Sequence, residues 1–105
     1  MNVRRTELEK SWARTRSYLD NAFVQLPTSP TEGEEGEEGG SMQKYREWLD
    51  YNELELALDE LEMLGEANGL GTSFWESLLR AAAEMKLDDH TVRLQRRLAG
   101  YKPMR

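Results

Sequence analysis

Carboxylates are the side chains that could do chemistry in this chain, and they are concentrated in its middle. Between Arg46 and Arg80 the sequence contains no Lys or Arg. The same stretch contains the carboxylates Glu47, Asp50, Glu53, Glu55, Asp59, Glu60, Glu62, Glu66 and Glu76. Carboxylates at this density can attract a basic molecule or chelate a cation, so their spacing decides which of them share a surface.

Four of these carboxylates recur at spacings that place them in one stripe on a helix. This acidic stripe consists of Glu55, Asp59, Glu62 and Glu66. Like charges at such spacings cost roughly a few tenths of a kcal/mol per pair when nothing neutralises them. A helix built only for stability would interleave Lys or Arg, so the pattern favours a neutralising charge from another molecule.

The edge of the acidic stripe carries two apolar side chains, Leu56 and Met63. A small apolar group bordered by charges is typical of an interface hot spot. We therefore predict a surface that binds a basic protein, made of Glu55, Leu56, Asp59, Glu62, Met63 and Glu66. Two alternatives stay open. The stripe is a solvated helix face, or it is neutralised internally by Arg93, Arg96 and Arg97.

Catalytic and metal-binding signatures are not found in the sequence. The only histidine is His90 and there is no cysteine, which argues against a typical structural zinc site and against thiol chemistry. The Glu-x-x-His signature of di-iron bundles and the aspartate-rich calcium loop are also missing. We predict that the chain is not an enzyme and has no cofactor, catalytic residue or metal ligand. His90 is expected to be a surface or cap-region histidine.

The composition indicates one soluble domain, residues 1–105. A formal net charge of −6 disfavours nucleic acid and anionic membranes as partners and suits a basic protein. Three Trp, four Tyr and two Phe are enough aromatic side chains to anchor a small core. The lack of cysteine, of a signal peptide and of a long apolar segment predicts a cytoplasmic protein.

Apolar residues recur at three- and four-residue spacings, which predicts helices and no strand. The first helix is expected over residues 3–26, with Leu8 and Trp12 on its apolar face, and the second over residues 42–50. The third helix is expected to follow Asn52, its predicted N-cap, with Glu55 at the capping-box spacing three residues later. It is expected to stop at Asn68-Gly69. The fourth opens at Thr72 or Ser73, and Asp88 or Asp89 caps a fifth. We predict an all-α, four- to five-helix antiparallel bundle.

Residues 27–41 differ in composition from the rest of the chain. This segment is rich in Pro, Gly, Ser, Thr and Glu and supplies almost no apolar group to bury. It is predicted to be a long, flexible acidic Glu/Gly loop between the first and second helices. Ordering of this loop on a basic partner is the alternative.

Two segments together resemble a known family. Residues 51–66, YNELELALDELEMLGE, are followed by Phe74-Trp75 and by Leu78-Leu79-x-Ala-Ala82. This pattern is similar to small bacterial immunity proteins of the MafI-like group, in which an NE-x-x-x-AL-x-x-L helix precedes an FW-x-x-L-x-x-A-A helix. The resemblance covers the C-terminal half and implies an inhibitor that neutralises a cognate polymorphic toxin, often a nuclease. It supplies no catalytic residue.

Three functions from different classes are therefore compared. The leading hypothesis is an immunity protein that binds a basic toxin domain through the acidic stripe. The second is a small helical adaptor, because residues 53–85 read as one tetratricopeptide-like hairpin. The third is a mimic of nucleic acid that inhibits a DNA-binding protein with the same carboxylates.

Overall fold

A computed structural model describes residues 3–33 and 40–100 of the chain. The described residues form five helices and no strand, which confirms the all-α prediction. The helices are α1 (Val3–Phe23), α2 (Met42–Asp50), α3 (Leu54–Asn68), α4 (Thr72–Glu84) and α5 (Asp88–Ala99).

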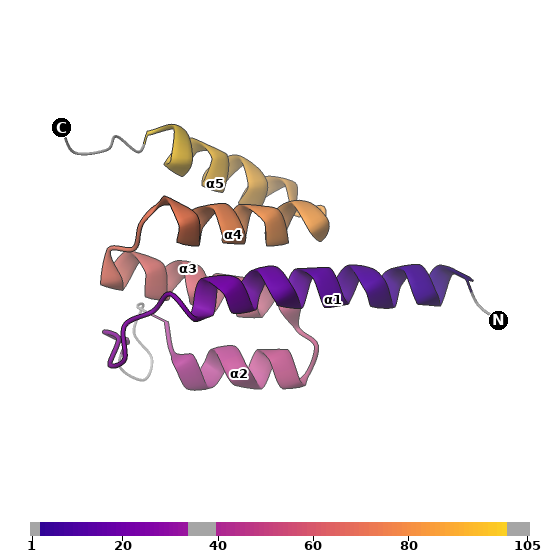
Figure 1. Cartoon of the computed structure of the whole chain (residues 1–105), viewed down its shortest axis with the longest axis horizontal. Helices are drawn as coiled ribbons and strands as arrows, with labels where there is room; N and C mark the ends of the chain where they lie inside the picture. The colour runs from indigo at the N-terminus through magenta and orange to yellow at the C-terminus, as the bar shows by residue number, and fades with distance from the viewer. Residues whose placement is uncertain (1–2, 34–39, 101–105) are drawn as a thin grey trace.

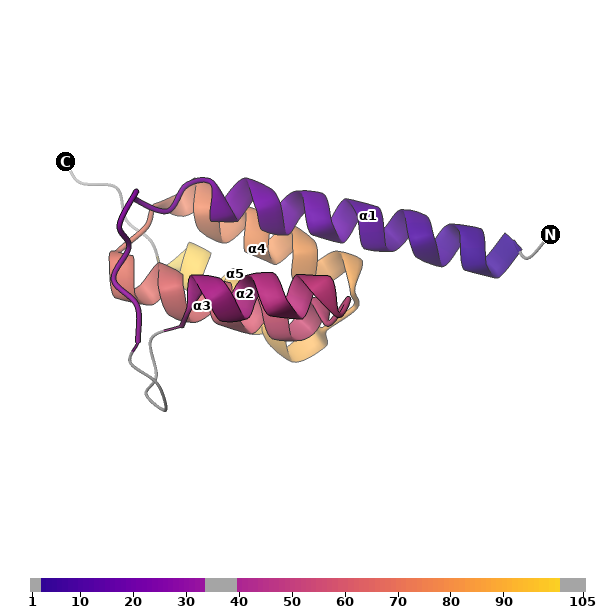
Figure 2. The ribbon, with the colours of Figure 1, turned by 90° about the horizontal axis from the view of Figure 1, so that it is seen from below.

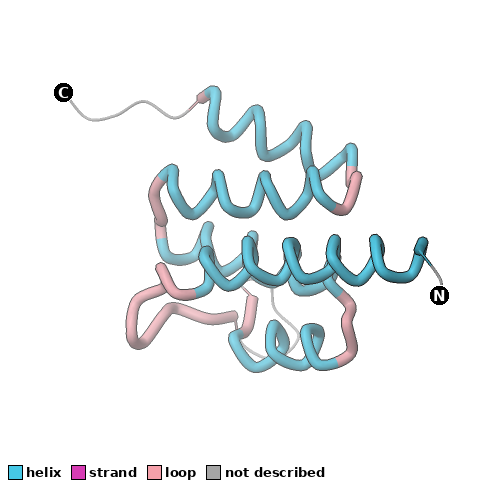
Figure 3. Tube along the Cα trace, turned by 45° about the vertical axis from the view of Figure 1, so that its right-hand side comes forward, coloured by secondary structure: helices cyan, strands magenta, loops and turns pink. Residues whose placement is uncertain are grey.

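Helix α4 is the central element, because it packs against α1, α3 and α5. Helices α3, α4 and α5 run in alternating directions, so α3 and α5 are parallel to each other, while α2 packs beside α3 (Figures 1 and 3). The turn between α2 and α3 and the turn between α4 and α5 therefore lie at the same end of the molecule. Helix α1 is longer than the others, and its N-terminal half projects beyond that end (Figure 2).

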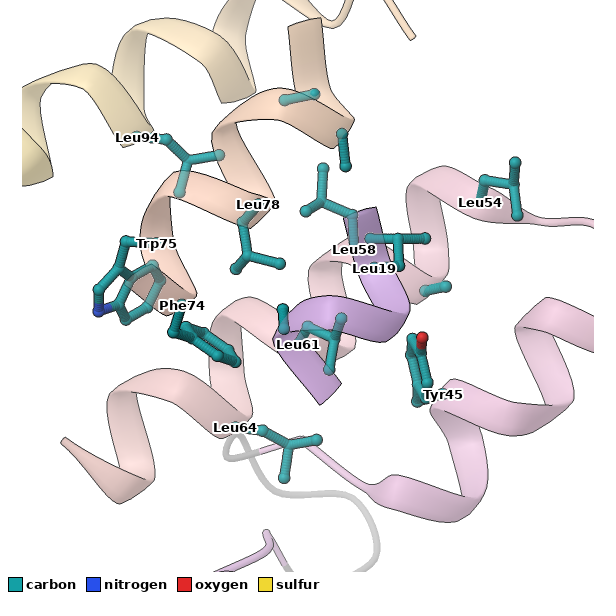
Figure 4. Packing of buried hydrophobic residues seen from close by; sticks show 14 residues of the cluster. Leu19, Tyr45, Leu54, Leu58, Leu61, Leu64, Phe74, Trp75, Leu78 and Leu94 are labelled. Atoms are coloured by element: carbon teal, nitrogen blue, oxygen red, sulfur yellow. The ribbon is translucent and has the colours of Figure 1, made fainter. Parts of the chain in front are cut away.

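The core is formed by the apolar faces of α3 and α4 with one side of α1 (Figure 4). Leucines from α1, α3, α4 and α5 are fully buried: Leu19, Leu58, Leu61, Leu64, Leu78 and Leu94. Phe74 and Trp75 pack edge to face with ring centroids 5.1 Å apart. Gly65 permits this packing, because a Cβ there would lie 2.3 Å from Phe74 Cε1. Helices α3 and α4 therefore approach closely at their linked ends.

The apolar face of α1 is only partly covered. Thr15, Leu19 and Ala22 are buried, whereas Leu8 and Trp12 are 49% and 36% exposed. The predicted inward orientation of Leu8 and Trp12 is thus wrong. Trp12 lies level with the last residue of α4, which Ser11 and Arg14 contact, and Leu8 lies before that point on α1. The helix also ends at Phe23 rather than residue 26, and the chain continues as a turn.

The helix caps separate one correct prediction from two wrong ones. Ser41 caps α2 as expected, its side chain accepting a hydrogen bond from the Lys44 amide. Asn52 does not cap α3; it has a φ of 57° and ends α2. The Asn52 and Glu53 amides donate to the Leu49 and Trp48 carbonyls, which is the Schellman arrangement that favours a left-handed Asn.

The same arrangement ends α4 and explains the second wrong cap. Lys86 has a φ of 58°, and the Lys86 and Leu87 amides donate to the Ala83 and Ala82 carbonyls. Leu87 therefore becomes the N-cap of α5, and no side chain of Asp88 or Asp89 caps it. Helix α4 begins at Thr72, one of the two predicted starting residues, and its N-cap is Gly71.

The described ends of the 27–41 segment are attached to α3. The side chain of Asn68 bonds to both the amide and the carbonyl of Thr31, at 2.8 and 3.0 Å. Gly40 is buried with a φ of 77°, and a Cβ there would lie 2.7 Å from the Glu60 carbonyl oxygen. Residues 34–39, which carry most of the Glu/Gly run, lie outside the described residues. The flexible acidic loop therefore stays a prediction for residues 34–39, whereas the backbone at residues 31 and 40 contacts α3.

Candidate functional site

Three members of the acidic stripe on α3 face basic or imidazole side chains of α5. Arg93 donates two hydrogen bonds to Glu62, at 2.8 and 3.0 Å. The guanidinium of Arg97 pairs with Glu66. His90 Nε2 lies 2.7 Å from Asp59 Oδ1. Each pair joins residues 31 positions apart, so the two parallel helices are in register along this charge ladder (Asp59–His90, Glu62–Arg93, Glu66–Arg97).

The charge ladder corrects the premise behind the predicted partner surface. The acidic stripe has no counter-charge nearby in sequence, but the fold supplies one from α5 through Arg93 and Arg97. The hydrogen bonds that Arg93 donates to the Glu62 carboxylate raise the pKa of Arg93. Internal neutralisation, which the sequence left open, therefore holds for Glu62 and Glu66. Arg96 is exposed and pairs with no described carboxylate.

At one end of the charge ladder, Arg97 lies over the ring of Trp75. The Arg97 guanidinium lies 4.1 Å from the centroid of the Trp75 ring, and Trp75 Nε1 donates to the Leu70 carbonyl. A cation over a tryptophan face gains electrostatic attraction. An open pocket of ≈ 230 Å³ lies here, lined by Gly65, Glu66, Gly69, Leu70, Trp75 and Arg97. Because its one cation is already paired, the pocket offers no free charge for an anion.

The opposite end of the ladder has a different chemistry. Oxygen atoms of Glu55 and Asp59 and a ring nitrogen of His90 all lie within 4.8 Å of one another. Asp59 is half-buried and Glu55 is exposed. The His90 side chain is only 13% exposed, so of the two predicted places, surface or cap region, the second holds: His90 lies in the first turn of α5 and faces α3. These three residues are the described group that could hold a metal ion.

The turns at this end of the molecule add further carboxylates. Asp50, Glu53, Glu55, Asp88 and Asp89 are exposed, and none of them forms an ion pair with another described side chain. We call these five residues the acidic end. Tyr51, the C-cap of α2, is 75% exposed, and Leu56, in the first turn of α3, is 37% exposed. Unpaired carboxylates and apolar surface thus occur together here.

The structure separates the six residues predicted to bind a partner. Glu55 and Leu56 are exposed at the acidic end, whereas Asp59, Glu62 and Met63 are half-buried. Glu66 is exposed but paired with Arg97. Tyr51 and His90 were missed. The matching three- and four-residue spacing of His90, Arg93 and Arg97 was the signal that could have revealed the charge ladder.

A second interhelical charge contact connects α1 with α4. Glu84 accepts hydrogen bonds from Arg14 at 2.8 Å and from Ser11 at 2.7 Å, which fastens α1 to the C-terminal end of α4. These bonds lower the pKa of Glu84 from 4.5 to about 2. The side chain of Glu84 is therefore a negative charge that α1 has already neutralised.

Comparisons with protein-family models, with curated proteins and with solved structures found no match. None of the described helices is long and apolar enough to cross a lipid bilayer.

Proposed function

We propose that this chain is a bacterial immunity protein that binds and neutralises a basic toxin domain, and that the acidic end is its binding surface. The observation that carries the proposal is the group of five exposed carboxylates without ion-pair partners beside Tyr51 and Leu56. The resemblance to the MafI-like group supplies the inhibitory role, and the cytoplasm of the producing cell is the expected location.

The chemistry of the acidic end suits a basic protein better than a small molecule. Exposed carboxylates attract a basic surface over a distance and can raise association rates to about 10⁸–10⁹ M⁻¹s⁻¹ at low salt. Tyrosine is enriched at interface hot spots, because it buries a large area at low entropic cost. Tyr51 and Leu56 therefore provide contacts that hold the complex after the charges have brought the partners together.

The paired half of the stripe has a separate role in this proposal. Glu62 and Glu66 hold α3 and α5 in register, so they position the acidic end and do not contact the partner. This assignment changes the predicted surface from six residues along α3 to the exposed Glu55 and Leu56 with the neighbouring turns.

The test has two steps: a search for a secreted-toxin gene next to this one, and growth rescue by coexpression with its toxin domain. The wild-type chain should protect the cells, and Glu53→Lys with Glu55→Lys should abolish protection. The matched control, Asp20→Lys with Glu76→Lys, changes the net charge equally at exposed sites away from the acidic end. Circular dichroism of both variants checks that they fold.

The outcomes separate the two parts of the proposal. Failure of the wild-type chain to protect would refute the immunity role. Equal protection by both double variants would remove the acidic end from the mechanism. An affinity for the purified toxin domain that does not weaken with added salt would also contradict binding through charges.

A helical adaptor is the second candidate, favoured by the parallel register of α3 and α5. Paired residues of α3 and α5 are always 31 positions apart. A constant offset between parallel helices is also found between successive repeats of helical arrays. Such arrays need about three repeats, however, and tetratricopeptide units are 34 residues long. Among the described helices the 31-residue offset relates only α3 to α5, which is fewer repeats than such an array needs, so the immunity proposal is preferred.

A further inference from the structure

The three pairs of the charge ladder are not chemically equivalent. Glu62 and Glu66 each face an arginine, which is charged at every accessible pH. At the position next to them, Asp59 faces His90, and Glu55 lies one helical turn away on the same side of α3. Two carboxylates thus share one imidazole, a side chain whose neutral form is a common metal ligand. Helix α5 thus supplies an arginine to each of Glu62 and Glu66, and an imidazole nitrogen, which can bind a metal, near Asp59 and Glu55.

We propose that Glu55, Asp59 and His90 form a binding site for a divalent transition-metal ion, with Zn²⁺ as the best match. Two oxygens and one ring nitrogen are a ligand set that zinc accepts, whereas Mg²⁺ and Ca²⁺ prefer oxygen alone. The three ligand atoms come from two helices and lie within 4.8 Å of one another.

The geometry needs only a small adjustment to hold an ion. Zinc–ligand bonds of about 2.0–2.2 Å place two ligand atoms at most about 4 Å apart. His90 Nε2 and Asp59 Oδ1, at 2.7 Å, are already closer than that. Glu55 is exposed, so rotation of its side chain can bring a carboxylate oxygen to the same point. Water completes the coordination on the solvent side.

Metal binding would replace the existing bond between His90 and Asp59. The Nε2 lone pair must be free to bind the ion, so the proton that Nε2 donates to Asp59 moves to Nδ1 or is released to solvent. The ion then takes the place of that proton between the two side chains.

The neighbouring pairs make the site rigid before any ion arrives. Arg93 binds Glu62 with two hydrogen bonds one helical turn away, and this contact fixes α5 against α3. Metal ligands that are held in place lose less conformational freedom on binding. Since Glu55 also belongs to the acidic end, the metal site is tested on the chain alone, without any partner.

The experiment is calorimetric titration of the full chain with ZnCl₂ after dialysis against a chelator. We expect one saturable site. His90→Gln and Glu55→Gln should each weaken the affinity by about tenfold or more, the range reported for disturbed metal sites. Glu53→Gln is the matched control, an exposed carboxylate at the same end outside the triad, and it should bind as the wild type does.

Three results would overturn the proposal: no saturable binding by the wild-type chain, unchanged affinity of His90→Gln, or equal weakening by Glu53→Gln and Glu55→Gln. The last two would indicate diffuse binding to carboxylates, including the Glu/Gly segment. If His90→Gln does not fold, Glu55→Gln carries the test, because its side chain is exposed. As a second measurement, Zn²⁺ should shift the ring resonances of the chain's only histidine in the wild-type protein; unshifted resonances at saturation would also overturn it.

Discussion

The two halves of the acidic stripe are alike in sequence and opposite in environment. Glu62 and Glu66 are paired with arginines of α5, and the Glu62 side chain is only 15% exposed. Glu55, two turns earlier, is exposed without an ion pair among the described residues. The difference arises because α5 begins at Asp88 and so brings acidic residues, then one histidine, before its arginines.

The order of charges along the chain thus does not determine which charges remain unpaired on the surface. The paired half holds two helices together, and the unpaired half is available to a ligand. Substitutions on the two halves should therefore differ in sign as well as in size.

The largest loss of stability should follow removal of the Trp75 ring, which packs under Arg97 of the paired half. Trp75→Ala leaves a cavity between α3 and α4 and takes away the support of Arg97, with an expected loss of about 3–5 kcal/mol. Chemical denaturation measures it. Trp12→Ala is the matched control, because Trp12 is 36% exposed; a similar loss for both would contradict the difference in burial.

Charge reversal in each half gives the most direct test. Glu62→Lys places an ammonium against Arg93 and should cost about 1–2 kcal/mol, since like charges then meet at a half-buried position. Glu55→Lys should change the stability by about 0.5 kcal/mol or less, because it breaks no ion pair. Equal destabilisation by the two variants, measured by thermal melting, would show that the halves do not differ.

Glu84 of α4 is a paired carboxylate whose contribution to stability should depend on pH. The pKa of Glu84 is lowered from 4.5 to about 2 by Arg14 and Ser11. A depressed pKa stabilises the fold above pH 4.5, and that contribution disappears as the pH falls toward 2. Glu84→Gln should therefore lose less stability between those pH values than the wild type does, by at most about 1 kcal/mol. Identical pH profiles of unfolding would contradict this assignment.

The smallest effect is expected at the exposed pair at the end of the ladder. A double-mutant cycle of Glu66→Ala and Arg97→Ala should give a coupling of about 0.2–1 kcal/mol, as for surface ion pairs. High salt should reduce it. A coupling energy larger than the stability lost in Glu62→Lys would show that the Glu66–Arg97 pair contributes more than the Glu62–Arg93 pair.

Helix positions were largely predictable from sequence, and their contacts were not. Apolar spacing located all five helices, and Ser41 and Gly69 were read correctly as a cap and a stop. Asn52 was misassigned, because an asparagine can either start a helix or occupy a left-handed position after one. Only the neighbouring carbonyls decide between the two.

The candidate site shows the same limit. Glu55 and Leu56 were found from the stripe, but the pairing of Asp59 with His90 depends on the register of α3 against α5. That register follows from the packing of both α3 and α5 on α4. The spacing of His90, Arg93 and Arg97 matches that of the acidic stripe, but the spacing alone does not fix which residues face each other.

The constant separation within the charge ladder has a consequence for how the chain folds. Its contacts close loops of 31 residues, whereas Glu84 meets Arg14 and Ser11 across 70 and 73. Closing the longer loop costs about 0.7 kcal/mol more in chain entropy. Residues 54–99 therefore form a local unit that can assemble first, with α1 docking afterwards. In native-state hydrogen exchange, the amides of α1 should open at lower free energy than those of α3 and α4.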